Sequence, residues 1–143
     1  KFTLGIGNPI LRNQLCRTFE SWGGELTSVI SSKANIGSFG ISIGSGANIL
    51  ANANITTDVV IGRGLLMYPN SIITHDCKIG DFVELSPGST ILGHCKIGNN
   101  VHIGANATIL PNIIIEDNSV VGAGAVVTKN VASHLIVKGI PAK

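Results

Sequence analysis

Residues 71–103 read SIITHDCKIGDFVELSPGSTILGHCKIGNNVHI, and an aliphatic residue recurs in this stretch at every sixth position. The series continues beyond the stretch in both directions without a miss: Ile43, Ile49, Ile55, Ile61, Met67, Ile73, Ile79, Leu85, Ile91, Ile97, Ile103, Ile109, Ile115, Val121 and Val127. Two positions earlier stands a second series, mostly small or β-branched: Ala47, Ala53, Val59, Ser71, Cys77, Val83, Ser89, Cys95, Val101, Ala107, Ser119 and Ala125. Because residues two apart on a strand face the same side, each hexad presents one large and one small side chain to an interior.

A strict period of six decides the architecture. A helix with about 3.6 residues per turn would smear these positions around its surface, and a flat sheet would need turn signals every 8 to 12 residues or so. The physical solution is a mainly β solenoid of short strands, with three hexads to a coil and about 4.8 Å between coils. The pattern resembles the hexapeptide-repeat proteins, which implies a left-handed parallel β-helix of triangular cross-section.

The repeat also places two of the three cysteines. Cys77 and Cys95 fall in the small inward series, so we expect them to fill the core. A nucleophilic thiol must be reachable and activated. Cys16 lies outside the repeat and carries no readable signal.

Residues 1–33 lack the repeat. KFTLGIG is typical of a strand, NPILRNQLCRTFESWGG of a helix opened by Asn-Pro and closed by Gly-Gly, and ELTSVIS of a second strand. Such a βαβ unit is too small to bury its own faces. We therefore expect 1–33 to be a remnant of a Rossmann-like nucleotide-binding domain without its first strand and phosphate turn, and 34–143 to be the β-helix domain.

The corners of the predicted prism are where chemistry can lie, because the inward positions hold it together. The period of three hexads sorts the corner residues into three columns. The first column is polar and predicts a solvated edge: Ser45, Arg63, Asp81, Asn99 and Asp117. The second column is small and flat: Ala51, Pro69, Pro87, Ala105 and Ala123. The third column holds Thr57, His75, Gly93 and Pro111.

His75 and its neighbour Asp76 suit acyl transfer. His75 can take a proton from an incoming amine or hydroxyl, which is worth about 10² to 10⁴ in rate. Asp76 can hold the imidazole in the needed tautomer. Gly93, about one coil along the axis, leaves its backbone N–H open to a carbonyl oxygen, and one such donor can be worth about 10² to 10³.

Composition excludes several classes of function. A net charge of +2, with only 13% charged residues, gives no basic field for nucleic acid. No apolar run approaches the roughly 18 residues of a membrane span. An odd number of cysteines without metal-type spacing fits a reduced, cytoplasmic protein, and we expect no metal in the catalytic site.

A closer resemblance rests on three stretches: IITHDCKIGDFVELSPGSTILGHCKIG, IGANATILPNIIIEDNSVVGAGAVVTKNV and the closing VKGIPAK. They resemble the sialic-acid O-acetyltransferase-type family, which includes N-acetyltransferases acting on nucleotide-linked 4-amino sugars in glycan biosynthesis. FTLGIGNPILRNQL resembles the end of that family's N-terminal domain. The resemblance implies acetyl-CoA as co-substrate and a UDP- or dTDP-linked 4-amino sugar as acceptor, acetylated by direct attack.

Residue by residue, the resemblance makes His75 the general base and Asp76 the acid that increases its basicity. It implies that Gly93, Ala105 and Ala123 line the acetyl-CoA path and that Gly7 lies near the nucleotide sugar. Glu84 occupies a place where many relatives carry a histidine that contacts acetyl-CoA. The family's homotrimer is expected as well, because the columns of Gly93 and Ala105 lie about 15 to 20 Å apart, so that a narrow cofactor arm near both must run between two prisms.

Three other functions stay open at the level of sequence. O-acetylation of a sugar hydroxyl, as in sialic acid, needs the same base and the same thioester. A γ-type zinc carbonic anhydrase would need three convergent ligands from His75, His94, His102 and His134, whose spacing differs from that class. A non-catalytic solenoid scaffold would have no use for a base beside an open amide.

Overall fold

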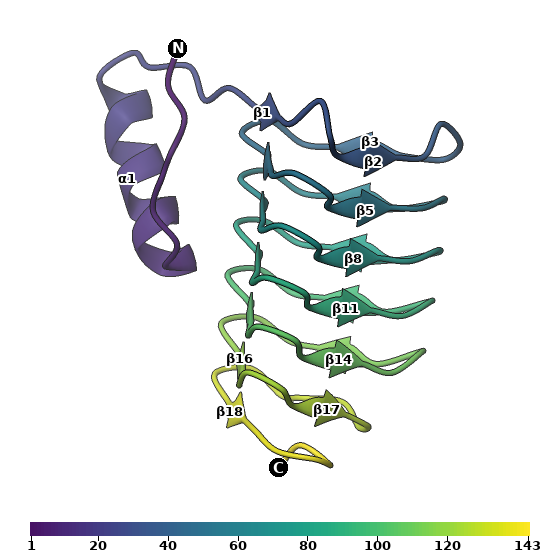
Figure 1. Ribbon diagram of the computed structural model, residues 1–143. Helices are drawn as coiled ribbons and strands as arrows, with labels where there is room; N and C mark the ends of the chain where they lie inside the picture. Colours follow the sequence, from purple (N-terminus) through teal and green to yellow (C-terminus); the bar gives the residue numbers. More distant parts are fainter.

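The computed structural model describes all residues from 1 to 143 and shows a tall stack of short-stranded coils with one helix beside it (Figure 1). The strands form three parallel sheets, which we name after a central strand. The β10 sheet contains β1 (Val29–Ile30), β4 (Asn48–Ile49), β7 (Leu66–Met67), β10 (Glu84–Leu85), β13 (His102–Ile103), β16 (Val120–Val121) and β18 (Ile136–Val137).

The other two sheets follow the same rise along the stack. The β11 sheet contains β2 (Asn35–Ile36), β5 (Asn54–Ile55), β8 (Ile72–Ile73), β11 (Thr90–Ile91), β14 (Thr108–Ile109) and β17 (Val126–Val127). The β12 sheet contains β3 (Ser42–Ile43), β6 (Val60–Ile61), β9 (Lys78–Ile79), β12 (Lys96–Ile97) and β15 (Ile114–Ile115). The expected mainly β, left-handed parallel β-helix is confirmed.

The two inward series form the core, as the period predicts. Leu85 pairs in register with Met67 on one side and with Ile103 on the other, so each large residue stacks on its equivalent in the next coil. These side chains are fully buried, and each contributes roughly 1.5–3 kcal/mol by leaving water. Cys77 and Cys95 lie in the same core at 0% exposure, which confirms their reading as core residues.

The chain turns between sheets at three corners, which we name after one residue. The His75 corner (Thr57, His75, Gly93, Pro111) joins the β11 sheet to the β12 sheet; the Asp81 corner (Ser45, Arg63, Asp81, Asn99, Asp117) joins β12 to β10; the Pro87 corner (Ala51, Pro69, Pro87, Ala105, Ala123) joins β10 to β11. The β10 sheet is therefore the face opposite the His75 corner.

The Asp81 corner is not the simple solvated edge that its composition predicts. Its side chains reach back one coil: Asp81 Oδ1 accepts from the Arg63 N–H at 2.9 Å, and Asn99 Oδ1 accepts from the Asp81 N–H at 2.8 Å. Asp117 continues the ladder by accepting from the Asn99 N–H at 2.7 Å. These bonds satisfy backbone donors that the corner would otherwise leave free.

The N-terminal unit contains α1 (Pro9–Ser21), which stands beside the upper part of the stack (Figure 1). Asn8 caps the helix by accepting the Leu11 N–H at 3.0 Å, and Pro9 occupies the first turn, where no N–H is needed. Gly23 ends the helix with a φ of +82°, a conformation that glycine adopts without strain.

The strands expected on either side of α1 are reduced to one parallel bridge, between Phe2 and Leu26. The predicted second strand, over residues 25–31, divides. Leu26 stays with the N-terminal unit, whereas the Val29 N–H donates to the Ala47 carbonyl at 2.8 Å and begins the first coil. The open end of the stack offers this segment two backbone partners in register, whereas Phe2 offers only a single bridge. The division into 1–33 and 34–143 remains a prediction, but β1 lies on the solenoid.

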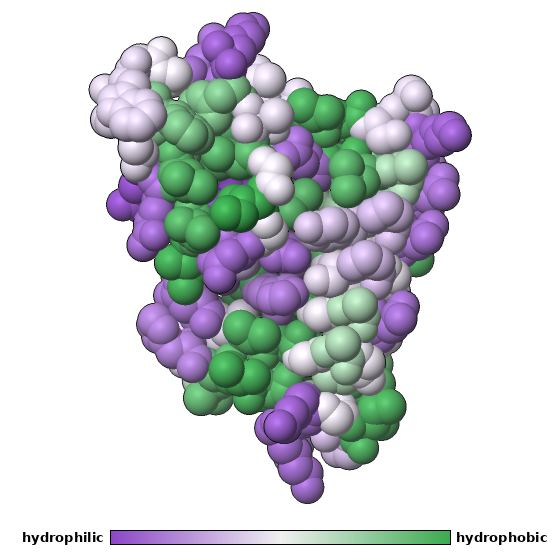
Figure 2. Space-filling view, turned by 60° about the vertical axis from the view of Figure 1, so that its left-hand side comes forward, coloured by the Kyte–Doolittle hydropathy of each residue, from purple (hydrophilic) through white to green (hydrophobic).

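Apolar side chains remain exposed on this unit. Figure 2 shows them gathered at its upper left, over the N-terminal residues. Ile10 and Leu11 on α1 are 50% and 40% exposed, and Trp22 at its end is 74% exposed. The structure contains no helix with the length and apolarity that a membrane crossing requires.

Candidate active site

The predicted base and its acid form a hydrogen-bonded pair at the His75 corner. His75 Nδ1 lies 2.8 Å from Asp76 Oδ2, and both side chains are about half exposed, at 51% and 46%. The pair stands between β8 and β9, two strands locked into their sheets by neighbours above and below. When the Nδ1–H group donates a hydrogen bond to Asp76, the lone pair of Nε2 is free to accept a proton from a substrate.

Gly93 lies directly beneath the His75 ring, one coil further along. A Cβ at this position would stand 2.4 Å from His75 Cε1 and 2.7 Å from Nε2, so no other residue fits while the ring keeps its place. The Gly93 N–H donates to no group of the chain. The structure thus brings together His75, Asp76 and Gly93, the residue types of a base and an oxyanion donor.

His94, which the sequence offers only as one of four histidines for a zinc site, joins this group in the structure. Its ring meets the His75 ring edge to face with centroids 5.3 Å apart, and its Nε2 lies 3.8 Å from Asp76 Oδ2. The signal was present in the spacing. Asp76 and His94 occupy equivalent positions in successive coils, with φ values of 59° and 62°.

A second group, on the β10 sheet, brings together Gly7 and Glu84. A Cβ on Gly7 would lie 3.5 Å from Glu84 Oε1 and 3.5 Å from the Tyr68 hydroxyl. Glu84 is only 7% exposed, and burial raises the pKa of its carboxyl, against the opposing effect of His102 and Arg12. His102 Nε2 lies 3.8 Å from Glu84 Oε1 and 3.1 Å from the Ser86 hydroxyl.

Arg12 supports this second group, although no sequence pattern predicts such a role for it. Its guanidinium donates to the carbonyls of Ile6 and Gly7 on the N-terminal unit and of Gly64, Phe82 and Val83 on the solenoid. Burial lowers the pKa of Arg12 to about 10, while the Glu84 carboxylate and Tyr68 act in the opposite direction. Arg12 therefore fixes the backbone at Gly7 against the sheet that carries Glu84.

Ala105 and Ala123 lie at the Pro87 corner, where the Gly124 N–H donates to the Ala105 carbonyl at 2.8 Å. The β11 sheet separates them from the His75 corner, and Glu84 faces away from that corner on the opposite sheet. Within one chain, the predicted site residues thus fall into three places: His75 with Asp76 and Gly93, Gly7 with Glu84, and the two alanines.

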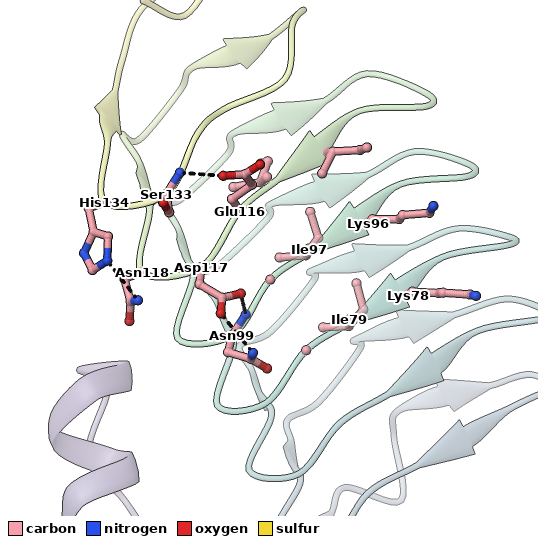
Figure 3. Close-up of a pocket in the computed structure, with 14 residues that line it drawn as sticks. Lys78, Ile79, Lys96, Ile97, Asn99, Glu116, Asp117, Asn118, Ser133 and His134 are labelled. Carbon is pink, nitrogen blue, oxygen red and sulfur yellow. Dashed lines mark hydrogen bonds between the residues drawn. The ribbon is translucent and has the colours of Figure 1, made fainter.

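The one sizeable groove, of about 710 Å³, contains none of these residues (Figure 3). It lies along the β12 sheet, where the last coil is shortened and Ile115 bridges Val131 instead of a residue 18 positions on. Its acidic side chains serve the backbone and the corner ladder: Glu116 accepts the Ser133 N–H at 3.1 Å, and Asp117 accepts from Asn99. The groove is a product of the irregular coil.

Comparison with known proteins identifies the family. The family described as bacterial transferase hexapeptide (six repeats) matches residues 94–129. WeeI from Acinetobacter baumannii AYE shares 32% identity with a TM-score of 0.93, and the match covers 99% of this chain and 68% of WeeI. The chain belongs to the hexapeptide-repeat sugar acetyltransferases.

Two other structures similar to this acetyltransferase come from named enzymes. PerB from Caulobacter crescentus, crystallised in complex with CoA and GDP-perosamine, shares 29% identity with a TM-score of 0.94. The acetyltransferase domain of PglB from Neisseria gonorrhoeae FA1090 shares 29% identity with a TM-score of 0.92. Each match covers 99% of this chain and 68% of the other. No curated protein sequence gives a significant match.

Proposed function

We propose that this acetyltransferase moves the acetyl group of acetyl-CoA onto the amino group of a nucleotide-linked 4-amino sugar, with His75 as general base. The observation that carries the proposal is the 2.8 Å contact of His75 Nδ1 with Asp76 Oδ2 on a rigid corner above Gly93. PerB, which was crystallised with CoA and an amino-sugar nucleotide, supports the class of substrate. Because that nucleotide is GDP, the acceptor panel extends beyond UDP and dTDP sugars.

The reaction runs by direct attack. The lone pair of the sugar amine forms a bond to the thioester carbonyl carbon while His75 Nε2 takes a proton from the nitrogen. The carbonyl oxygen becomes an oxyanion, for which the Gly93 N–H is the proposed donor. When the C=O bond re-forms, the CoA thiolate leaves and receives the proton from the imidazolium. The mechanism has no acyl-enzyme step. Cys77 and Cys95, the thiols nearest to His75 in the repeat, are fully buried and cannot reach the thioester.

We also infer that the working enzyme is an oligomer, in keeping with the trimer expected from the sequence. Gly7, the proposed sugar contact, and Glu84 lie on the sheet opposite the His75 corner, so one chain cannot present both to one substrate. A second copy, placed with its His75 corner against this sheet, completes the site. In this arrangement residues 1–33 contact the nucleotide sugar, and Ala105 and Ala123 lie beside the path of the CoA arm.

The test is acetyl-CoA consumption with GDP-, UDP- and dTDP-linked 4-amino sugars beside their 4-hydroxy counterparts and CMP-sialic acid. We expect turnover with an amino sugar, reduced about 10² to 10⁴-fold in His75→Ala. His134→Ala is the control, because His134 is also an exposed histidine but lies at the Asp81 corner, where its N–H donates to the Asp117 carbonyl. Turnover that is indifferent to His75 would refute the assigned base.

The same assay decides the alternative, O-acetylation of a sugar hydroxyl. Turnover confined to the 4-hydroxy sugars or to sialic acid would change the acceptor and leave the His75 corner as the site. The geometry of the pair favours neither acceptor, because an amine and a hydroxyl must both lose a proton. The amine is preferred on the likeness to PerB.

A further inference from the structure

Three side chains at the His75 corner converge on one point. Asp76 and His94 are equivalent residues of successive coils, so the backbone ladder fixes their separation; the His94 N–H donates to the His75 carbonyl at 3.1 Å. Because Gly93 has no side chain, the His75 ring lies beside them. One ligand atom from each of the three residues lies within 4.8 Å of the other two.

Two imidazole nitrogens and one carboxylate oxygen are a common ligand set for Zn²⁺ and similar divalent metals. Tetrahedral bonds of about 2.0–2.1 Å place the ligand atoms roughly 3.3 Å apart. The distances from Asp76 Oδ2, 2.8 Å to His75 Nδ1 and 3.8 Å to His94 Nε2, lie on either side of that separation. Because all three ligand atoms lie within 4.8 Å of one another, side-chain rotations without a backbone shift can bring them to an ion.

The position is open to solvent and unique on its column. The three side chains are 46–57% exposed, which leaves room for an ion to arrive and for water to complete its coordination. The neighbouring coils carry Thr57 and Asp58 on one side and Pro111 and Asn112 on the other, so neither adds a histidine.

We propose that His75, Asp76 and His94 bind Zn²⁺ and that the bound ion switches off acetyl transfer. The ion takes the place of the proton between His75 Nδ1 and Asp76 Oδ2. A neutral imidazole keeps one proton, which then resides on Nε2, and the base has no lone pair left for the substrate. Metal binding at this set is independent of the acetyl acceptor, whereas the inhibition rests on the proposed role of His75.

Binding is measured directly, with Co²⁺ as a spectroscopic probe of the metal alone. We expect d–d absorption bands of a low-coordinate site on titration of the full chain, and their loss on addition of Zn²⁺. His94→Asn should weaken Co²⁺ binding at least about tenfold, since even an outer-shell partner of a metal is worth that much. His94→Asn should also fold normally, because Asn112, its equivalent one coil on, has a φ of 65°.

The matched control is His134→Asn, which removes a histidine of the same φ from another corner and should leave Co²⁺ binding unchanged. Absent d–d bands, or bands of equal strength in His94→Asn, would overturn the metal site while leaving the acetyltransferase proposal intact.

The inhibition is measured in the acetyl-CoA assay with and without Zn²⁺. We expect wild type to lose turnover as Zn²⁺ is added, and whatever turnover His94→Asn has without metal to be insensitive to Zn²⁺. If Co²⁺ binds but Zn²⁺ leaves wild-type turnover unaltered, the inhibition is overturned and His75 is not the base. If the chain shows no turnover with any acceptor while His94→Asn still loses Co²⁺, the metal site stands and the proposed function fails.

Discussion

At the scale of single residues, a glycine decides where the histidine ring of the proposed site can lie. Gly93 has an ordinary negative-φ backbone, so its lack of a side chain is not required by the turn. It is required by the His75 ring above it, which would collide with any Cβ. The same absence allows Asp76 and His94 to meet the ring. One missing methyl group thus shapes both the proposed base and the proposed metal site.

Replacing Gly93 by alanine should therefore damage activity and spare the fold. The new Cβ displaces the His75 ring by an ångström or more, and a shift of that size in a catalytic group costs about 10² in rate. The measurement is kcat together with the thermal midpoint. Gly5→Ala serves as control, because a Cβ at Gly5 meets nothing within 4 Å. Unchanged turnover in Gly93→Ala would argue against the ring position as the working one.

At the scale of elements, the attachment of α1 depends on one buried cation. Arg12 is 2% exposed and joins backbone carbonyls of the N-terminal unit to carbonyls of two successive coils. A second contact links Glu20 near the end of the helix to Arg63 of the Asp81 corner, and that hydrogen bond raises the pKa of Arg63. The sequence predicts a helix within residues 8–24 from Asn-Pro and Gly-Gly, and the structure has it at 9–21. An arginine in such a helix is ordinarily expected to face solvent, so its burial was not predicted.

Replacing Arg12 by methionine should loosen α1 while the coils stay folded. The substitution leaves the backbone carbonyls that Arg12 serves without a donor, and each buried acceptor left unpaired costs about 1–3 kcal/mol. Hydrogen exchange is expected to lose protection over residues 9–21 and to keep it over the β11 sheet. Arg17→Met, on the exposed side of the same helix, is the control. Equal loss of protection throughout would mean that the helix and the solenoid unfold as one unit.

At the scale of the whole molecule, the predicted site residues lie on opposite sides of a rigid prism. The His75 corner and the β10 sheet cannot approach each other, because the stacked core of isoleucines fills the space between them. A substrate that contacts both must therefore lie between two chains. This is the structural reason for the oligomer that we propose.

Subunit complementation tests that arrangement. His75→Ala removes the base, and Gly7→Leu fills the space beside Glu84 on the other side of the prism. Each variant alone should be nearly inactive, whereas chains that are mixed and reassembled should regain activity, because some sites then combine an intact corner with an intact sheet. Activity that stays at the sum of the two variants would place the whole site within one chain.

The sequence by itself determined the coil, the inward residues and the pairing of His75 with Asp76. In a solenoid the distance between two residues follows from their separation along the chain. A period of six therefore specifies which residues form the core and the corners, and it places Gly93 one coil from His75. The same spacing places Asp76 and His94 at equivalent positions of successive coils.

Only the tertiary structure decided what α1 touches. It buried Arg12, brought Gly7 to Glu84 and Tyr68, and assigned Val29–Ile30 to the first coil. The repeat does not extend into the N-terminal unit, so separation along the sequence does not predict which residues of the two parts touch. They depend on how one helix docks against a corner, which is settled by the fit of side chains and by buried carbonyls that need a donor.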